Sequence, residues 1–408
     1  MSGDAPHPHG RRVVLGVCGG IAAYKACELL RRFTESGHDV HVVPTASALK
    51  FVGETTWAAL SGNPVSTDVW TGAHRVPHVM LGRQADLVVV APATADFLAR
   101  LVIGRSDDLL TATLLTARCP VVVAPAMHTE MWQHPATEAN VATLRERGVI
   151  VLDPAVGRLT GKDTGIGRLP DPEEIFGVAR SVLERGVASL APDLLRRHVV
   201  VTAGGTREPL DPVRFLGNRS SGRQGYALAR AAHARGAEVT LISANPTLAD
   251  PAGAKVVRVA TAEDMRIAVE EAASSADAIV MAAAVADFRP ADRSATKIKK
   301  GASEPDVIAL VRNADILAEI SANRRRSGQV IVGFAAETDD VLANGRAKLA
   351  AKGCDLIVVN EVGEHRTFDS EHNTATILGA DGSCTEVAEG SKEALGHAIW
   401  DLVVTRLG

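Results

Sequence analysis

The sequence predicts an α/β protein built from two doubly wound, Rossmann-like domains, and three observations support this prediction. Short apolar segments alternate with helical segments along the whole chain. Hydrophobic residues make up 46% of the chain and aromatic residues only 3%, a composition typical of Val-, Ala-, Leu- and Ile-rich parallel strands covered by helices. The order strand, glycine-rich turn and helix occurs twice, once from Val13 and again from Val199.

Length and pattern predict where these domains lie. A chain of 408 residues exceeds one typical hydrophobic core, which favours two domains. The alternation restarts directly after the stretch 189–197, so we place the boundary near residue 190. The expected organisation is a loose N-terminal tail (1–12), a first domain (13–189) and a second domain (190–408).

Charge and cysteine usage exclude several classes of function. The net charge of −4 offers no basic excess for binding a nucleic-acid polymer. The five cysteines are scattered and show no metal-binding spacing, which favours reduced thiols in the cytoplasm. We find no signal peptide before Val13 and no apolar run that reaches the roughly 18 residues of a membrane span. Small molecules are therefore the expected partners.

The first half reads as a series of βα units. Strands are expected at 13–17, 40–43, 87–91, 121–124 and 149–152. Helices are expected at 21–35, 95–102, 109–116 and 138–147. In such a sheet, ligands bind outside the carboxyl ends of the strands.

Four loops at those ends carry small or hydroxylated residues. They are Cys18 to Gly20, Pro44 to Ser47, Ala91 to Thr94 and Ala124 to Met127. A structural turn explains any one of them alone, but four in register indicate a site for a phosphate-bearing cofactor. The glycine-rich stretch from Gly157 to Leu169 is expected to be a mobile flap outside the sheet, followed by a helix from Pro170 to Gly186.

The second half repeats this pattern. Strands are expected at 199–202, 238–242, 256–259, 278–282, 330–334 and 356–360, with a helix at 226–235. Gly204 and Gly205 follow the first of these strands and allow close backbone approach. Lys297, Lys299 and Lys300 follow the fourth strand, either as a solvated face or as a lid that brings positive charge to phosphates.

Specific motifs then connect the two halves to one family. In the second half they are Gly205 to Arg214 (GTREPLDPVR), Asn218, Ser220 to Gly222, Ala283 to Asp287 (AAVAD), Lys297 to Lys300 (KIKK), Asn313 to Ile316 (NADI) and Gly333 to Thr338 (GFAAET). In the first half they are Gly19 to Lys25 (GGIAAYK), His78, Ala91 to Asp96 (APATAD) and Pro125 to Met127 (PAM). From Val13 to Leu407 the chain resembles the bifunctional flavoproteins of coenzyme A biosynthesis, in which a phosphopantothenoylcysteine decarboxylase is fused to a phosphopantothenate-cysteine ligase.

The resemblance implies a CTP-dependent ligase fold in the second domain. There, the carboxylate of 4'-phosphopantothenate attacks CTP, and cysteine then displaces CMP from the acyl-cytidylate, with Mg2+ assisting. The implied roles are neutralisation of charge for Lys297, positioning of the acyl phosphate for Asn218 and substrate binding for Arg214. The implied nucleotide-binding residues are Ala283, Asp287, Lys297, Asn313, Ala314, Asp315, Ile316, Phe334, Lys348 and Lys352.

For the first domain the resemblance implies a flavoprotein decarboxylase fold that uses FMN. FMN oxidises the thiol of the substrate to a thioaldehyde, CO2 leaves, and the electrons return, so no nicotinamide is needed. The implied FMN-binding residues are Gly19, Gly20, Ile21, Thr45, Ser47, Ala93, Thr94 and Met127. His78 matches the catalytic histidine of the family.

Two positions depart from the family pattern. His128 stands where relatives carry an asparagine that binds the substrate carboxylate, and an imidazole can also donate a hydrogen bond there. The flap lacks the cysteine that donates a proton in many relatives. Thr160, Lys162, Asp163 or a water molecule could supply that proton, and the sequence does not choose among them.

Two other classes of protein remain as alternatives. One is a flavoprotein fused to an NAD-type dehydrogenase, although the second half lacks a G-x-G-x-x-G motif followed by an acidic residue at a strand end. The other is a flavin-binding protein without catalysis, which the missing flap cysteine allows. The family further implies a homo-oligomer, with a dodecamer built from trimeric and dimeric contacts as the expected form.

Overall fold

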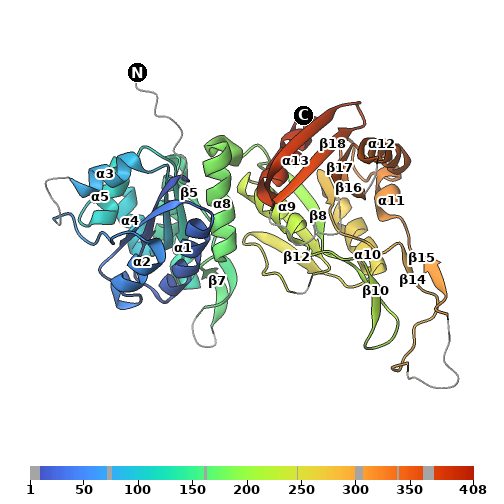
Figure 1. The fold of residues 1–408 in the computed structure, drawn as a ribbon, viewed down its shortest axis with the longest axis horizontal. Coiled ribbons are helices and arrows are strands. Elements are labelled where there is room, and N and C mark those ends of the chain that lie inside the picture. Colours follow the sequence, from blue (N-terminus) through green and yellow to red (C-terminus); the bar gives the residue numbers. More distant parts are fainter. Residues whose placement is uncertain are drawn as a thin grey trace. The chain divides into compact units, whose positions relative to one another are not determined.

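The computed structural model describes residues 10–70, 76–159, 163–245, 247–298, 307–337, 340–361 and 372–408. The chain divides into two compact units, residues 1–189 and 190–408, each with its own sheet (Figure 1). In the part of the chain that the structure describes, no helix is both long enough and apolar enough to span a membrane.

The first unit is built on a five-stranded parallel sheet with the strand order β2-β1-β3-β4-β5. The strands are β1 (Arg12–Val17), β2 (Asp39–Pro44), β3 (Leu87–Ala93), β4 (Val121–Pro125) and β5 (Ile150–Val151). Every residue of β3 is buried, as expected for a strand covered on both faces. In this doubly wound order the direction of the windings reverses between β1 and β3, and ligands bind at this switch point.

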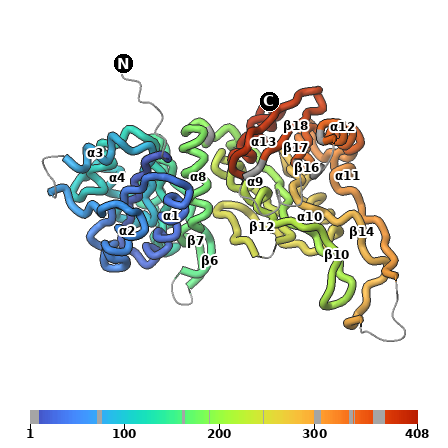
Figure 2. Tube along the Cα trace, viewed as in Figure 1, coloured from blue at the N-terminus to red at the C-terminus, as the bar shows by residue number. Residues whose placement is uncertain are grey.

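Helices cover both faces of this sheet. They are η1 (Ile21–Tyr24), α1 (Lys25–Glu35), η2 (Ala48–Lys50), α2 (Glu54–Ser61), α3 (Pro77–Gln84), α4 (Ala95–Val102), α5 (Leu109–Thr116), α6 (Thr129–Trp132), α7 (Pro135–Glu146) and α8 (Pro172–Arg185). Helices α1 and α8 pack side by side (Figure 2). Helices α4, α5 and α7 contribute Leu98, Leu110 and Leu144 to a second layer on the sheet.

The structure differs from the sequence-based expectation in three places of this unit. The helix expected from Ile21 begins with a short 3-10 turn, and α2 and α3 had no strong apolar periodicity to reveal them. The stretch 157–169, expected to be a mobile flap outside the sheet, lies outside the five-stranded sheet but contains parts of an antiparallel hairpin formed by β6 (Ala155–Arg158) and β7 (Thr164–Arg168). Hairpin pairing satisfies backbone groups with few apolar side chains, so the glycine-rich composition concealed it.

The second unit contains an eight-stranded sheet with the order β12-β11-β8-β13-β16-β17-β18-β19. The strands are β8 (His198–Ala203), β11 (Glu238–Ser243), β12 (Ala254–Arg258), β13 (Ala278–Met281), β16 (Val330–Glu337), β17 (Leu356–Glu361), β18 (His372–Gly379) and β19 (Cys384–Ser391). Neighbours are parallel as far as β17, and β18 and β19 add an antiparallel edge that the sequence did not reveal. The windings reverse between β8 and β13, which places a second switch point there.

Alternate residues of β8 face two helical layers. Val199 and Val201 pack toward α9 (Arg223–Ala234) and α13 (Lys392–Leu407). Val200 packs toward α10 (Ala262–Ala273), α11 (Ile316–Ala322) and α12 (Val341–Lys352). A short turn, η4 (Val187–Leu190), precedes this unit.

Two small antiparallel hairpins complete the second unit. They are formed by β9 (Arg207–Pro209) with β10 (Phe215–Gly217) and by β14 (Phe288–Pro290) with β15 (Leu310–Arg312). Figure 1 shows both hairpins extending away from the main sheet of the unit. Strands of three residues carry too little apolar pattern to be predicted from sequence.

Candidate functional site

Backbone hydrogen bonds join the four predicted cofactor loops of the first unit into one continuous edge. Thr45 N donates to Val17 O at 2.9 Å, and Cys18 N donates to Pro92 O at 3.1 Å. Ala126 N donates to Ala93 O at 3.0 Å, which ties the loop after β4 to the loop after β3. The structure therefore brings together the loops that carry Gly19, Gly20, Thr45, Ser47, Ala93, Thr94 and Met127.

Two threonine hydroxyls in these loops have a hydrogen available for donation to a ligand. Thr45 Oγ1 accepts from Ala48 N at 3.2 Å, and Thr94 Oγ1 accepts from Phe97 N at 3.2 Å as the N-cap of α4. A hydroxyl that accepts a backbone N–H keeps its own hydrogen for another acceptor. Both side chains can thus offer an O–H to an anionic group at the switch point.

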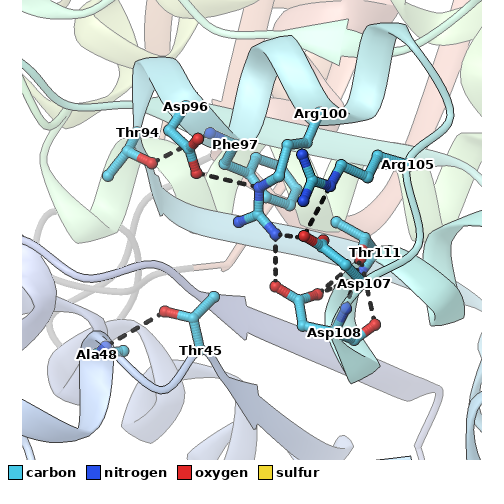
Figure 3. A network of polar contacts seen from close by, with 10 residues as sticks. All are labelled: Thr45, Ala48, Thr94, Asp96, Phe97, Arg100, Arg105, Asp107, Asp108 and Thr111. Carbon is cyan, nitrogen blue, oxygen red and sulfur yellow. Dashed lines mark hydrogen bonds and ion pairs between the residues drawn. The ribbon is translucent and has the colours of Figure 1, made fainter.

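A charged network fixes the helix that starts at Thr94. Arg100 on α4 pairs with Asp96 at 3.0 Å, with Asp107 at 3.0 Å and with Asp108 at 2.7 Å. Figure 3 shows Arg100 between these carboxylates, and Asp108 at the same time caps α5. Because three acceptors occupy this guanidinium, its role is to hold α4 and the start of α5 in place beside the cofactor loops.

These loops fit a flavin mononucleotide. Backbone amides of the extended Gly20 and of the helical start behind it suit a phosphate group. Ile21, which is 68% exposed, and the half-buried Met127 offer apolar surface for a flat ring. Gly19 lies so close to the next loop that a Cβ there would stand 2.3 Å from Ser47 Cβ, so the backbone at this point leaves no room for a side chain.

Histidine positions in this unit have different environments. His78 lies in the first turn of α3, where its carbonyl accepts from Thr116 Oγ1 at 2.8 Å. Its Nδ1 is buried and has no hydrogen-bond partner within the described residues, a costly state for a structural histidine. His128 precedes α6 and is partly exposed, at the end of the loop after β4.

The hairpin of β6 and β7 is attached to that same loop. Met127 N donates to Gly167 O at 2.9 Å, and Thr129 Oγ1 donates to Ile166 O at 2.7 Å. Of the three candidate proton donors, Asp163 belongs to the hairpin that the structure describes, whereas Thr160 and Lys162 lie outside the described residues. Strand β7 thus packs directly on the segment that carries Met127 and His128.

Cys18 is the first residue of the loop after β1, and its side chain is buried. Burial raises the pKa of the Cys18 thiol to about 12. A thiol that remains protonated up to such a pH acts as a small apolar side chain. Cys18 is therefore part of the core of the unit.

In the second unit, the loop after β13 is held against the loop after β8. Ala284 N donates to Gly204 O at 2.8 Å, and Thr206 N donates to Ala284 O at 3.2 Å. Two fully buried hydroxyls complete the contact, since Thr202 Oγ1 accepts from Ala283 N and Thr206 Oγ1 accepts from Ala286 N. These bonds fix the backbone from Ala283 to Asp287, the two residues of this segment that the family resemblance implies in nucleotide binding.

Two predicted asparagines border this loop. Asn218 Nδ2 donates to Val285 O at 2.9 Å, and Asn313 Nδ2 donates to Ala286 O at 2.7 Å. Asn313 N also donates to Asp287 O at 2.9 Å, and its Oδ1 accepts from Arg289 at 2.9 Å. The structure thus gathers Asn218, Ala283, Asp287 and Asn313 around one loop at the second switch point.

The remaining predicted nucleotide-binding residues lie on neighbouring elements. Asp315 caps α11 through Ala318 N, with Ala314 before it and Ile316 as the first helical residue, and it pairs with Lys352 of α12. Lys348 lies one turn before Lys352 and is exposed, and the half-buried Phe334 belongs to β16. Asp315 and Lys352 therefore form an ion pair with each other, in addition to the nucleotide-binding role that the sequence predicts for them.

The predicted substrate-binding Arg214 contacts the segment that carries Lys297. Its guanidinium pairs with the buried Asp211 at 2.7 Å and donates to Ile298 O at 2.8 Å. Lys297 itself is exposed. Lys299 and Lys300 lie outside the described residues.

Sequence reasoning missed several residues that build these sites. Thr202, Thr206 and Asp211 are buried polar residues that organise the second site through backbone hydrogen bonds. Asp211 and Thr206 both lie in the quoted motif GTREPLDPVR, so the motif contained the signal but did not reveal the roles. Among the described residues, no group of three His, Cys, Asp or Glu side chains could hold a metal ion.

The fold defines a flavoprotein-type α/β domain joined to a second doubly wound α/β domain. Family models agree with this class: one described as Flavoprotein matches residues 4–183, and one described as DNA/pantothenate metabolism flavoprotein C-terminal domain matches residues 194–407. The chain is 60% identical to the coenzyme A biosynthesis bifunctional protein CoaBC of Mycolicibacterium smegmatis, over 97% of this chain and 98% of that one. It belongs to this family of bifunctional coenzyme A biosynthesis proteins.

Other relatives extend the comparison. The chain is 41% identical to the coenzyme A biosynthesis bifunctional protein CoaBC of Escherichia coli (strain K12), over 97% of each chain. A crystal structure of the C-terminal domain of a coenzyme A biosynthesis bifunctional protein CoaBC shares 34% identity, covering 53% of this chain and 98% of that one with a TM-score of 0.46. A PPC decarboxylase mutant complexed with pantothenoylaminoethenethiol shares 32% identity, covering 43% of this chain and 100% of that one with a TM-score of 0.40.

Proposed function

We propose that this chain catalyses two consecutive reactions of coenzyme A biosynthesis, with the ligase in residues 190–408 and the decarboxylase in residues 13–189. The ligase joins cysteine to 4'-phosphopantothenate at the expense of CTP, and the decarboxylase converts 4'-phosphopantothenoylcysteine to 4'-phosphopantetheine with FMN. The chain resembles the bifunctional relatives over nearly its full length, at 41–60% sequence identity, and this similarity supports both activities. The clustering of Asn218, Asp287 and Asn313 around one loop is the structural observation that carries the ligase assignment.

In the first ligase step, a carboxylate oxygen of 4'-phosphopantothenate forms a bond to the α-phosphorus of CTP, and pyrophosphate leaves. Negative charge increases on the phosphate oxygens during this step, so cationic and N–H donors lower its barrier. Lys297 supplies the cation from the segment after β14. The nucleotide is held by Ala283, Asp287, Asn313, Ala314, Asp315, Ile316, Phe334, Lys348 and Lys352.

In the second ligase step, the amine of cysteine forms a bond to the acyl carbon, loses a proton, and CMP leaves. Asn218 has two amide hydrogens, and Val285 O accepts one of them. The other hydrogen is then directed to the acyl phosphate, which positions the acyl carbon for attack. Arg214 is the proposed contact for the substrate on the same side of the loop.

The decarboxylase half uses its loops to bind and orient rather than to react. FMN, when bound, supplies the two-electron oxidation of the substrate thiol and returns the electrons after CO2 has left. Gly19, Gly20, Ile21, Thr45, Ser47, Ala93, Thr94 and Met127 hold it. His78 accepts or orients the thiol proton, which the unpartnered Nδ1 supports, and His128 donates a hydrogen bond to the substrate carboxylate.

Three further features belong to this proposal. Mg2+ binds with the triphosphate of CTP and is held mainly by phosphate oxygens and water.

The chain is a homo-oligomer, up to a dodecamer. Exposed apolar residues on the two hairpins, including Phe215, Phe288 and Leu310, support a contact between copies of the chain there. Free cysteines fit a reducing, cytoplasmic location.

A coupled assay tests the proposed function. The purified chain is given CTP, Mg2+, cysteine and 4'-phosphopantothenate, and pyrophosphate and CO2 are followed separately. We expect pyrophosphate to appear only when CTP and 4'-phosphopantothenate are both present, and CO2 to require cysteine in addition. Turnover with a nicotinamide dinucleotide, or flavin binding without either product, would instead favour one of the alternative classes.

The histidine assignment has its own test. We expect His78→Asn to keep FMN, because the predicted FMN-binding residues lie on other elements, and to lose CO2 release from supplied 4'-phosphopantothenoylcysteine. Flavin absorbance measures retention of the cofactor, and trapped CO2 measures the reaction. Normal CO2 release by this variant would remove His78 from the catalytic residues.

A further inference from the structure

The side chain of Asp211 is completely buried and is surrounded by hydrogen-bond donors. Its Oδ1 accepts from Val213 N at 2.7 Å and from Arg214 N at 2.8 Å. Its Oδ2 accepts from Arg214 Nε at 3.0 Å, from Arg214 Nη2 at 2.7 Å and from Ile298 N at 3.2 Å. Burial acts to raise the pKa of this carboxyl, but the hydrogen bonds from Val213, Arg214 and Ile298 outweigh it and hold the pKa far below its ordinary value.

These contacts join two segments that lie 87 residues apart. Ile298 is held at both of its backbone groups, since its N–H donates to Asp211 and its carbonyl accepts from Arg214 Nη2 at 2.8 Å. Ser294 N donates to Leu210 O at 3.0 Å, which attaches the same segment a second time. The two attachments lie on either side of Lys297.

The loop that contains Asp211 also leads to Asn218. Leu210 N donates to Arg214 O at 2.9 Å, and this bond closes the turn between β9 and β10. Strand β10 then ends at Gly217, directly before Asn218. The buried carboxylate of Asp211 therefore holds the turn between β9 and β10. This turn contacts the segment that carries Lys297 and leads through β10 to Asn218, and these are the two residues proposed to act on the nucleotide phosphates.

We propose that Asp211 is a positioning residue for the nucleotide-consuming step, which holds Arg214 and Ile298 so that Lys297 is directed at the phosphates of CTP. This inference rests on the proposed ligase function of Lys297. Only a carboxylate can serve here, because asparagine has one acceptor oxygen and would direct N–H groups at the donors of Arg214 and Ile298. A displacement of about 1 Å is enough to slow a reaction about a hundredfold.

A double-mutant cycle on the full-length, FMN-loaded protein tests the inference. The variants are Asp211→Asn, Lys297→Gln and the double variant, and the readouts are kcat and KM for pyrophosphate release with CTP, Mg2+, cysteine and 4'-phosphopantothenate. We expect Asp211→Asn to lower kcat by about a hundredfold with a smaller change in the KM for CTP. In the Lys297→Gln background the same substitution should have almost no further effect on kcat, because the lysine that it positions is already missing, and any effect that remains should be on the KM for 4'-phosphopantothenate through Arg214.

Matched controls separate positioning from general damage. Asp292→Asn removes an exposed carboxylate from the same segment and should leave kcat unchanged. CO2 release from supplied 4'-phosphopantothenoylcysteine should remain normal in every variant. If Asp211→Asn does not fold, Ile298→Pro replaces it: proline removes the N–H that Asp211 accepts and also restricts the backbone at Lys297, so it should lower kcat in the same way, whereas Ile298→Ala keeps the N–H and should leave kcat unchanged.

The outcomes distinguish this inference from the function on which it rests. Normal pyrophosphate release by Lys297→Gln would overturn the proposed role of Lys297 itself. If Lys297→Gln is impaired but Asp211→Asn is not, or if the two effects multiply in the double variant, the positioning role of Asp211 is wrong while the proposed function stands. An effect of Asp211→Asn on the KM for CTP alone would likewise refute it.

Discussion

Replacing Gly205 by alanine should slow the ligase reaction about a hundredfold by separating two loops of its site. A Cβ at this position would stand 2.5 Å from the carbonyl oxygen of Asn218. Ordinary contact begins at 3.4 Å, so the two backbones must move apart by about 0.9 Å, a displacement of the size that disturbs a catalytic arrangement. Gly205 does not have a positive φ, so this contact alone opposes the alanine.

The contacts of Gly205 determine which neighbouring segment must move to make room for the added Cβ. On its other side, Gly205 pairs with Ala284, so the loop cannot retreat without disturbing the segment from Ala283 to Asp287. Either Asn218 or this segment must shift. A hundredfold loss in kcat/KM corresponds to about 2.7 kcal/mol of lost transition-state stabilisation.

The assay is pyrophosphate release under the full set of substrates, with CO2 release from supplied 4'-phosphopantothenoylcysteine as the internal control. Gly390→Ala in β19 is the matched variant, because its nearest neighbours would lie at 3.6 Å or farther, and it should behave as the wild type. A Gly205→Ala enzyme within about twofold of the wild-type kcat/KM would refute the argument, since it would show that the two loops tolerate this separation.

Four further predictions concern buried groups and the side-chain amide of Asn218. Thr206→Val leaves Ala286 N without its buried acceptor, so calorimetry should show a loss of about 2 kcal/mol in ligase-unit stability, whereas Thr206→Ser should retain most of it. Asn218→Asp places a carboxylate against Val285 O and the acyl phosphate, so mass spectrometry should detect accumulated acyl-cytidylate, and wild-type turnover would contradict this role. Burial raises the pKa of Cys18 to about 12 and that of Cys354 to about 11, so at pH 8 iodoacetamide should label the exposed Cys384 first and these two only after unfolding. Because both pKa values lie above the ordinary 9.0, their contribution to stability is complete below pH 9 and should fall as the pH rises through about 11 and 12 in alkaline denaturation.

The parallel cores could be predicted because their strands are apolar on both faces. Val199, Val200 and Val201 form a continuous run that only a strand between two helical layers can bury, and the sequence shows it directly. The expected order of loops then placed Thr45, Thr94 and Met127 at one edge. The structure brings these loops together through backbone hydrogen bonds.

The small hairpins and the polar contacts could not be predicted in the same way. Strands β9, β10, β14 and β15 have three residues each, which is too short to leave an apolar pattern. The bond between Asp211 and Ile298 joins residues whose proximity depends on how both hairpins are placed. His78 was recognised from the family pattern, but its place in α3 was not, because that helix is short and weakly amphipathic.

Strand β7 has a consequence for the undecided proton donor of the decarboxylase. A Cβ on Gly165 would stand 2.3 Å from Thr129 Oγ1, and a Cβ on Gly167 would stand 2.2 Å from Met127 O. The face of β7 that touches the proposed flavin loop is therefore bare of side chains, and substitution cannot add one without detaching the strand. An acidic group introduced or sought on that face has no space, so the proton that completes the decarboxylase reaction must come from the turn between β6 and β7, from another element or from water.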